Sequence, residues 1–127
     1  DWKRPWRITG NSSVYRFKLG AFPGLLPYFR EHFDEIRQKF RNEQAYLSWY
    51  VDREKKLSYW PESWCKSYKY HCLQKIPMAY FKPPVKPEGA KIIVFHGEIN
   101  PPDAVNGGGG KWYRYVLPSQ WIKDAWQ

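Results

Sequence analysis

The sequence has 127 residues, of which 43% are hydrophobic and 26% are charged, and this composition excludes a disordered or collagen-like chain and fits one globular domain. No apolar run approaches the about 20 residues that span a bilayer, and no apolar targeting segment follows Asp1, so we expect a secretory signal to be absent or already removed. The net charge of +9 favours polyanionic partners such as nucleic acid, anionic lipid or nucleotide phosphates, although such a charge can also serve solubility alone.

The two cysteines, Cys65 and Cys72, lie close together in the sequence. One disulfide is compatible with this spacing, but a single pair does not make a disulfide framework, and we expect two reduced, largely buried thiols in a cytosolic protein. A zinc site is not indicated, because the sequence has no Cys-x-x-Cys pair. Catalysis by a cysteine with His71 is disfavoured, since adjacent positions on a strand face opposite ways.

The first half of the chain alternates between turns and short apolar patterns. Residues 13–17 alternate as a short strand does, and residues 20–24 form a turn. Apolar spacing predicts an amphipathic helix over 25–33 and a second helix over 42–54, for which Asn42 is the expected N-cap. Two further candidate strands follow, over 57–60 and 64–70.

The second half begins with a proline-rich stretch, 77–87, which we interpret as an extended loop that ties two parts of one domain together; a linker between domains is the alternative. The clearest strand is 91–96, whose apolar run predicts a buried, central position. Four glycines in 106–110 predict a mobile loop. We expect a last strand over 112–115 and a short final helix from Ser119, its expected N-cap, to Trp126.

Aromatic residues make up 20% of the chain, and several stand beside cations. In a nucleic-acid complex the rings of such a set stack on bases, and its cations contact the phosphate backbone. The first set of this kind comprises Trp2, Lys3, Arg4, Trp6, Arg7, Lys66, Tyr68, Lys69 and Tyr70. A second set fits a membrane interface and comprises residues 111–115 with Trp121, Ile122, Ala125 and Trp126. In both cases we favour the alternative that the rings belong to the core or its rim.

Polar and small residues follow the predicted central strand, in the order Phe95-His96-Gly97-Glu98-Ile99-Asn100-Pro101-Pro102. Ligands of open α/β sheets bind beyond the carboxyl ends of strands. A histidine there, followed by a glycine that lets the backbone approach a ligand, suits contact with a phosphate or a metal. The alternative is a histidine that hydrogen-bonds a turn.

This segment resembles the C-terminal motif of GT-A-type nucleotide-sugar glycosyltransferases, in particular glycosyltransferase family 8 and its bacterial relatives, in which a strand is followed by His-x-x-Gly-x-x-Lys-Pro. Gly97 to Pro101 match the Gly-x-x-Lys-Pro part, with Asn100 in place of the lysine. The family's histidine aligns with Val94, and His96 lies two residues on, so it points to the same face of a strand. The resemblance implies that His96 is a metal ligand and that Gly97 and Asn100 lie near the donor diphosphate.

Other segments match the family in the same order along the chain. Asn11 and Ser12 resemble its Asn-Ser-Gly strand beside the donor sugar and the acceptor, and Trp60 to Lys69 resemble a segment of bacterial members. Glu43 and Gln44 resemble the Asp-Gln pair that opens the following helix and faces the acceptor; helix capping is the alternative role of Glu43. The resemblance therefore implies catalytic roles for Glu43 and Gln44, and substrate-binding roles for Asn11, Ser12, Lys69, Gly97 and Asn100.

The family's N-terminal half, with its nucleotide-binding βα units and an Asp-x-Asp metal motif, has no counterpart here, and the sequence contains no Asp-x-Asp. The resemblance implies an α/β fold with a small mixed sheet and two or three helices. This fold would form a single domain over residues 1–127, equivalent to the C-terminal, acceptor-side part of a GT-A fold.

We therefore expect a glycosyltransferase fragment, inactive by itself, from an enzyme that transfers a sugar from a nucleotide-diphosphate sugar to a hydroxyl of a carbohydrate or lipid-linked acceptor. The family implies Mn²⁺ or Mg²⁺ as cofactor and a partner chain or N-terminal half that completes the site. We expect a cytoplasmic location, with peripheral membrane contact as the alternative. The rival function is a non-enzymatic, basic, aromatic-rich module that binds nucleic acid or glycan, although the sequence carries no strong nucleic-acid signal.

Overall fold

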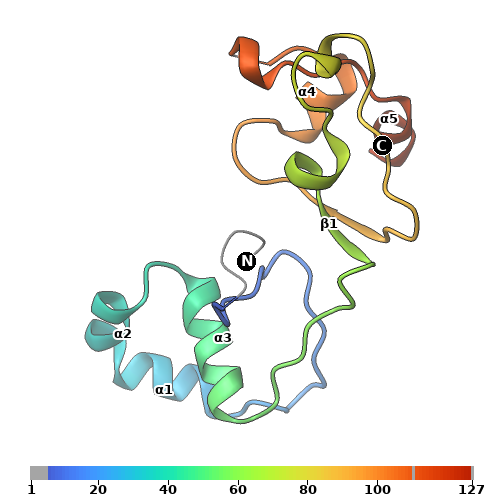
Figure 1. Cartoon of the computed structure of the whole chain (residues 1–127). Helices are drawn as coiled ribbons and strands as arrows, with labels where there is room; N and C mark the ends of the chain where they lie inside the picture. Colours follow the sequence, from blue (N-terminus) through green and yellow to red (C-terminus); the bar gives the residue numbers. More distant parts are fainter. Residues whose placement is uncertain (1–5, 110, 127) are drawn as a thin grey trace. The chain divides into compact units, whose positions relative to one another are not determined.

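The computed structural model of the chain describes residues 6–109 and 111–126, and it is an α/β protein with a two-stranded parallel sheet and several helices (Figure 1). The chain forms two compact units, which meet in the sequence between Tyr59 and Trp60. Among the described residues, no helix is both long and apolar enough to cross a membrane.

The first unit contains the helices α1 (Leu25–Glu31), α2 (Phe33–Lys39) and α3 (Glu43–Arg53) (Figure 1). The predicted helix over 25–33 is interrupted, because His32 has φ −112° and ψ 28° and separates α1 from α2. The predicted second helix is confirmed as α3. The Asn42 side chain caps it by accepting a hydrogen bond from the Ala45 N–H at 3.1 Å.

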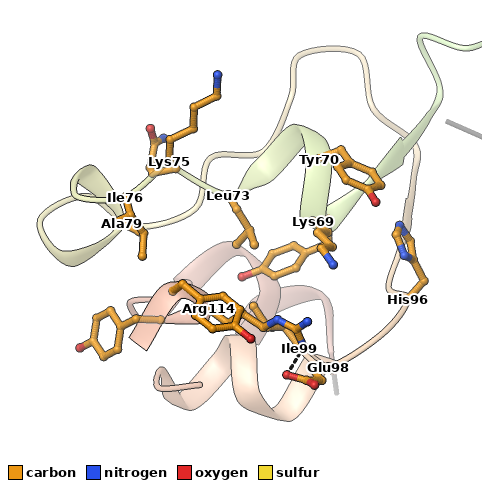
Figure 2. A pocket seen from close by; sticks show the side chains of 14 residues that line it. Lys69, Tyr70, Leu73, Lys75, Ile76, Ala79, His96, Glu98, Ile99 and Arg114 are labelled. Carbon is orange, nitrogen blue, oxygen red and sulfur yellow. Dashed lines mark ion pairs between the residues drawn. The ribbon is translucent and has the colours of Figure 1, made fainter. Parts of the chain in front are cut away.

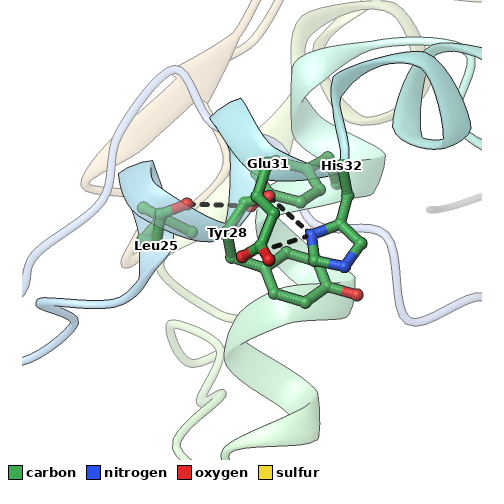
Figure 3. A network of polar contacts seen from close by, with 5 residues as sticks. Leu25, Tyr28, Glu31 and His32 are labelled. Carbon is green, nitrogen blue, oxygen red and sulfur yellow. Dashed lines mark hydrogen bonds and ion pairs between the residues drawn. The ribbon is translucent and has the colours of Figure 1, made fainter.

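The core of this unit is aromatic, which accounts for part of the unusual composition. Ile36, Tyr46 and Tyr50 are buried, and the rings packed around them include Phe22, Tyr28, Phe29, Phe40 and Trp49. Figure 3 shows the polar contacts at its edge: the Tyr46 hydroxyl donates to the Leu25 carbonyl at 3.0 Å, and the His32 ring stacks on Tyr28 with centroids 4.1 Å apart. The Arg53 guanidinium lies over three rings of this cluster, at 4.7 Å from Tyr28, 5.3 Å from Trp49 and 5.1 Å from Tyr50.

The strands predicted over 13–17 and 57–60 are not formed among the described residues. A strand is stable only when a partner satisfies its backbone groups, and the described part of this unit contains no other strand. Tyr15 and Phe17 are accordingly exposed. The alternating pattern therefore does not lead to a strand here, because the described residues of this unit offer no sheet to join.

The second unit holds the sheet, in which β1 (Cys65–Ser67) pairs in parallel with β2 (Ile92–Val94). Both strands are shorter than predicted, and the pair is parallel where we expected a mixed sheet. The predicted central position of 91–96 is wrong, because the sheet of the described residues has two strands, and in β2 only Val94 is buried. The candidate strand over 64–70 ends early because residues Tyr68–Cys72 form a π-helical turn, η1, capped by the Ser67 side chain.

Short helices complete this unit. They are η2 (Met78–Tyr80), α4 (Pro101–Asn106), η3 (Trp112–Arg114) and α5 (Gln120–Ala125). The predicted final helix is confirmed as α5, whereas the strand predicted over 112–115 is largely η3. The buried core brings η1, α4 and α5 together and consists of Tyr68, Cys72, Ala104, Val116 and Ile122.

The proline-rich stretch lies within this unit, and several hydrogen bonds tie it to the rest of the unit. The Val85 N–H donates to the Cys72 carbonyl at 3.0 Å, and the Trp121 Nε1–H donates to the Pro84 carbonyl at 3.0 Å. The segment therefore joins two parts of one unit, as the preferred interpretation expected.

The described part of the glycine segment over 106–110 makes specific backbone contacts, and its mobility stays a prediction. The Gly108 N–H and carbonyl both bond to Val116 at 2.7 Å. Gly107 has φ +79°, and a Cβ there would lie 2.7 Å from the Pro118 ring, so this position requires glycine.

Candidate functional site

The residues implicated by the sequence are divided between the two units. Asn11, Ser12, Glu43 and Gln44 belong to the first unit, whereas Lys69, His96, Gly97 and Asn100 belong to the second. Each group makes its own local arrangement.

In the first unit, the structure brings Ser12 and Glu43 together, although they are 31 positions apart. The Ser12 hydroxyl donates to Glu43 Oε1 at 3.4 Å. The segment before Ser12 is held on α3, because the Gly10 N–H donates to the buried Ser48 hydroxyl at 2.8 Å. Since Asn42 caps α3, Glu43 is not required as the cap, and its carboxylate is exposed at the start of the helix, where the helix dipole favours an anion.

The two remaining residues of this group have separate surroundings. The Asn11 side-chain oxygen accepts a hydrogen bond from the Ser13 N–H at 2.8 Å, so it closes a turn of its own segment. Gln44 follows Glu43 on α3 and is half-buried.

In the second unit, a pocket of about 390 Å³ opens beside the turn η1 and the residues that follow β2 (Figure 2). Lys69 and His96 both line it, so the structure places these two predicted residues at one pocket. Most of the other lining side chains are aromatic, aliphatic or basic, and they comprise Tyr68, Tyr70, Leu73, Gln74, Lys75, Ile76, Ala79, Glu98, Ile99, Tyr113, Arg114 and Tyr115.

His96 is held in place by a buried hydroxyl. Its Nε2 lies 2.7 Å from the Oγ of Ser67, and the direction of this hydrogen bond depends on the imidazole tautomer. Ser67 is fully buried at the end of β1. The centroid of the Tyr70 ring lies 5.4 Å from that of the imidazole, and Figure 2 shows both side chains at the pocket.

A second polar contact, which the sequence did not reveal, joins Glu98 to Arg114 across the pocket lining (Figure 2). The hydrogen bond from Arg114 lowers the pKa of the Glu98 carboxyl, and the charges of Lys111 and Lys69 act in the same direction. The sequence did not point to Arg114 as a pocket residue, because Arg114 lies on η3, far along the chain from the segment that follows β2. Only the tertiary structure brings it beside Glu98.

The other two motif residues play backbone roles. Gly97 has φ +85°, a conformation that favours glycine, and so turns the chain away from β2. Asn100 precedes α4, and its N–H donates to the Asp103 carboxylate at 3.0 Å. Neither residue is among those that line the pocket. Their substrate-binding roles stay predictions, and the Asn100 N–H is already engaged within the chain.

The donor set for a metal is small. Among the described residues, no group of three or more histidine, cysteine, aspartate or glutamate side chains is arranged to hold an ion. The Nε2 of His96 is engaged with Ser67, and the nearby Glu98 is paired with Arg114. The Mn²⁺ or Mg²⁺ site therefore stays a prediction of the resemblance.

The two cysteines do not form a disulfide in the structure, where Cys65 and Cys72 are both free. Burial raises the pKa of the Cys65 thiol, and it raises the pKa of Cys72 to about 11. Because the thiolate is the reactive form, Cys72 is poorly suited to act as a nucleophile.

The basic-aromatic sets are only partly available to a ligand. Tyr68 is 1% exposed and stacks on Phe95 with ring centroids 4.5 Å apart, so it cannot stack on a base, and the preferred interpretation of this ring as a core residue is confirmed. Trp6 is 76% exposed, whereas Trp2, Lys3 and Arg4 lie outside the described residues.

In the second aromatic set, Ile122 is buried in the core of the second unit and Trp121 packs against that core. Packing, the preferred alternative, therefore applies to these two residues. Trp112 and Trp126 are exposed.

Comparisons of the chain with protein-family models, curated proteins and solved structures found no match.

Proposed function

We propose that this chain is the acceptor-side part of a nucleotide-sugar glycosyltransferase and that the pocket of the second unit takes the diphosphate of the donor. The observation that carries the proposal is the pocket itself, which gathers the predicted residues Lys69 and His96 beside tyrosine rings and the cationic Arg114. Rings and cations in one pocket suit a ligand that combines a flat base or sugar with charged phosphates.

The contact between Ser12 and Glu43 supports the acceptor-side role of the first unit. Glu43 already accepts a hydrogen bond from one hydroxyl, and an acceptor hydroxyl offers the same kind of donor. During transfer, the acceptor oxygen forms a bond to the anomeric carbon, and the bond from that carbon to the diphosphate oxygen breaks. The diphosphate leaves with the electron pair, and the acceptor's proton passes to a base, the role we assign to Glu43.

Calorimetric titration of the 127-residue chain with a nucleoside diphosphate, the matching monophosphate and the unphosphorylated nucleoside tests the proposal. We expect the diphosphate to bind best, with a dissociation constant of about 0.1–1 mM that rises with salt. His96→Ala and Lys69→Gln should weaken binding at least threefold. Lys86→Gln is the matched control, because Lys86 is an exposed lysine of the same unit outside the pocket lining.

Equal binding of the diphosphate and the unphosphorylated nucleoside would contradict the proposal. So would a sub-micromolar complex with single-stranded RNA or DNA that is lost in Trp6→Ala, since stacking on an exposed ring contributes about 1–3 kcal/mol per base. That second outcome would favour the basic, aromatic-rich binding module instead.

A further inference from the structure

Arg114 already has an anionic partner in the pocket, and that partner belongs to the chain. Among the residues that line the pocket, Glu98 supplies the carboxylate, and it forms an ion pair with the Arg114 guanidinium. The Arg114 side chain is 28% exposed and that of Glu98 is 55% exposed. The guanidinium is thus partly enclosed, while its partner stands at the rim.

We propose that Arg114 is the cation that binds the phosphate oxygens of the ligand, and that Glu98 is a resident counter-ion which the ligand displaces. The inference rests on the proposed function for the identity of the ligand as a nucleoside diphosphate. The inference assigns to Arg114 of η3 the role of the cation at the phosphates. The segment after β2 supplies no cation at its motif position, where Asn100 stands in place of a lysine.

The surroundings of the two candidate positions favour Arg114. Asn100 carries no charge, its N–H is bonded to Asp103, and it does not line the pocket. Arg114 presents a planar fork of donors that matches two phosphate oxygens at once, and Lys69 lies in the same lining to add a second positive charge.

Glu98 is placed so that it can give way. An ion pair between half-exposed groups contributes little free energy, so a ligand with two phosphates and more charge competes well for the guanidinium. Gly97, immediately before Glu98, lacks the side chain that restricts the backbone, so the carboxylate can swing out to water. Arg114 exchanges one anion for another, and no partly buried charge is left without a partner.

The test is a calorimetric titration of the whole 127-residue chain with inorganic pyrophosphate. In Glu98→Gln we expect about two- to fivefold tighter binding, because the competing charge is gone. Glu88→Gln is the matched control: it removes the same charge from an exposed glutamate of the same unit outside the pocket lining, and it should leave the affinity nearly unchanged.

Arg114→Gln should weaken pyrophosphate binding at least tenfold, and Arg114→Lys should lie between it and the wild type, since it keeps the charge but loses the fork. Circular dichroism verifies the fold of each variant, and the lysine variant keeps the test valid if the glutamine variant unfolds. Equal or weaker binding in Glu98→Gln overturns the inference, as does full binding in Arg114→Gln or no pyrophosphate binding by any form of the chain.

The inference and the proposed function fail in different ways. If pyrophosphate binds through Arg114 but a nucleoside diphosphate binds no better than pyrophosphate, the glycosyltransferase proposal loses its support and the role of Arg114 stands. If a nucleoside diphosphate binds through Lys69 and His96 but ignores changes at residues 98 and 114, the role of Arg114 and Glu98 is wrong and the proposed function stands.

Discussion

Ser67 and His96 are hydrogen-bonded, with Oγ and Nε2 2.7 Å apart, although 29 positions separate them in the sequence. The parallel register explains the contact. Ser67 pairs with Val94 at the ends of β1 and β2, so the residues beyond Val94 emerge beside Ser67. A buried residue at the end of one strand therefore orients the side chain that follows the other strand into the pocket.

We expect Ser67→Ala to lower the free energy of unfolding by about 1–3 kcal/mol, because it leaves the half-buried imidazole without this partner and removes the cap of η1. The nitrogen chemical shifts of His96 should report a changed tautomer balance. Ser63→Ala is the control, since Ser63 is exposed in the same unit. Unchanged shifts at His96 in Ser67→Ala would mean that the serine does not orient the ring.

The cap of α3 gives a prediction for the first unit. Asn42→Ala should reduce its stability by about 1 kcal/mol, because the Ala45 N–H loses its acceptor, whereas Asn42→Asp should keep most of the stability. Urea unfolding followed by circular dichroism measures the difference. Equal midpoints for the alanine and aspartate variants would contradict a capping role.

Two glycines with positive φ angles differ in the space that is open to a side chain. Gly107 and Gly89 have φ +79° and +71°, but only at Gly107 would a Cβ meet the Pro118 ring. Gly89→Ala should reduce stability by about 1 kcal/mol from the backbone alone, and Gly107→Ala should reduce it by about 2–4 kcal/mol. Thermal unfolding of the two variants compares them, and equal losses would argue against close packing at Gly107.

Alkaline pH should destabilise the second unit through its buried thiol. The pKa of Cys72 is about 11 in the folded state against an ordinary value of 9.0, so above pH 9 the unfolded chain releases a proton that the folded chain retains. The stability that this thiol contributes is therefore complete below about pH 9 and is lost as the pH rises towards 11. Urea unfolding of the wild type and of Cys72→Ala at pH 7 to 11 should give a shallower decline for the variant, and parallel declines would contradict the prediction.

Features with a local origin could be predicted from the sequence. The helix α3 has its cap, Asn42, and its apolar positions within one short segment, and its bounds agree with the prediction within one residue. The strand β2 was located because its β-branched run is continuous. The helix α3 is determined largely within its own segment, whereas β2 also needs its partner β1 to satisfy its backbone groups.

Features that depend on distant partners could not be predicted. The segment 13–17 has a strand-like pattern but no strand to pair with among the described residues of its unit. The alternation over 64–70 continues beyond Ser67, yet Tyr68 turns into the core and the chain enters a π-helical turn. The link between Glu98 and Arg114 likewise arises only when η3 packs beside the residues that follow β2.

The proline-rich segment tied to Cys72 and Trp121 affects the unfolded chain as well as the folded one. Prolines at positions 83, 84 and 87 restrict the backbone before folding begins, so this segment loses less conformational entropy when it docks than a glycine- or serine-rich one of the same length. It forms neither a helix nor a strand at these positions, yet its hydrogen bonds connect η1 to α5. The conformational entropy that the segment loses on folding is small. Replacing its prolines would therefore weaken the second unit without removing the backbone groups that bond to Cys72 and Trp121.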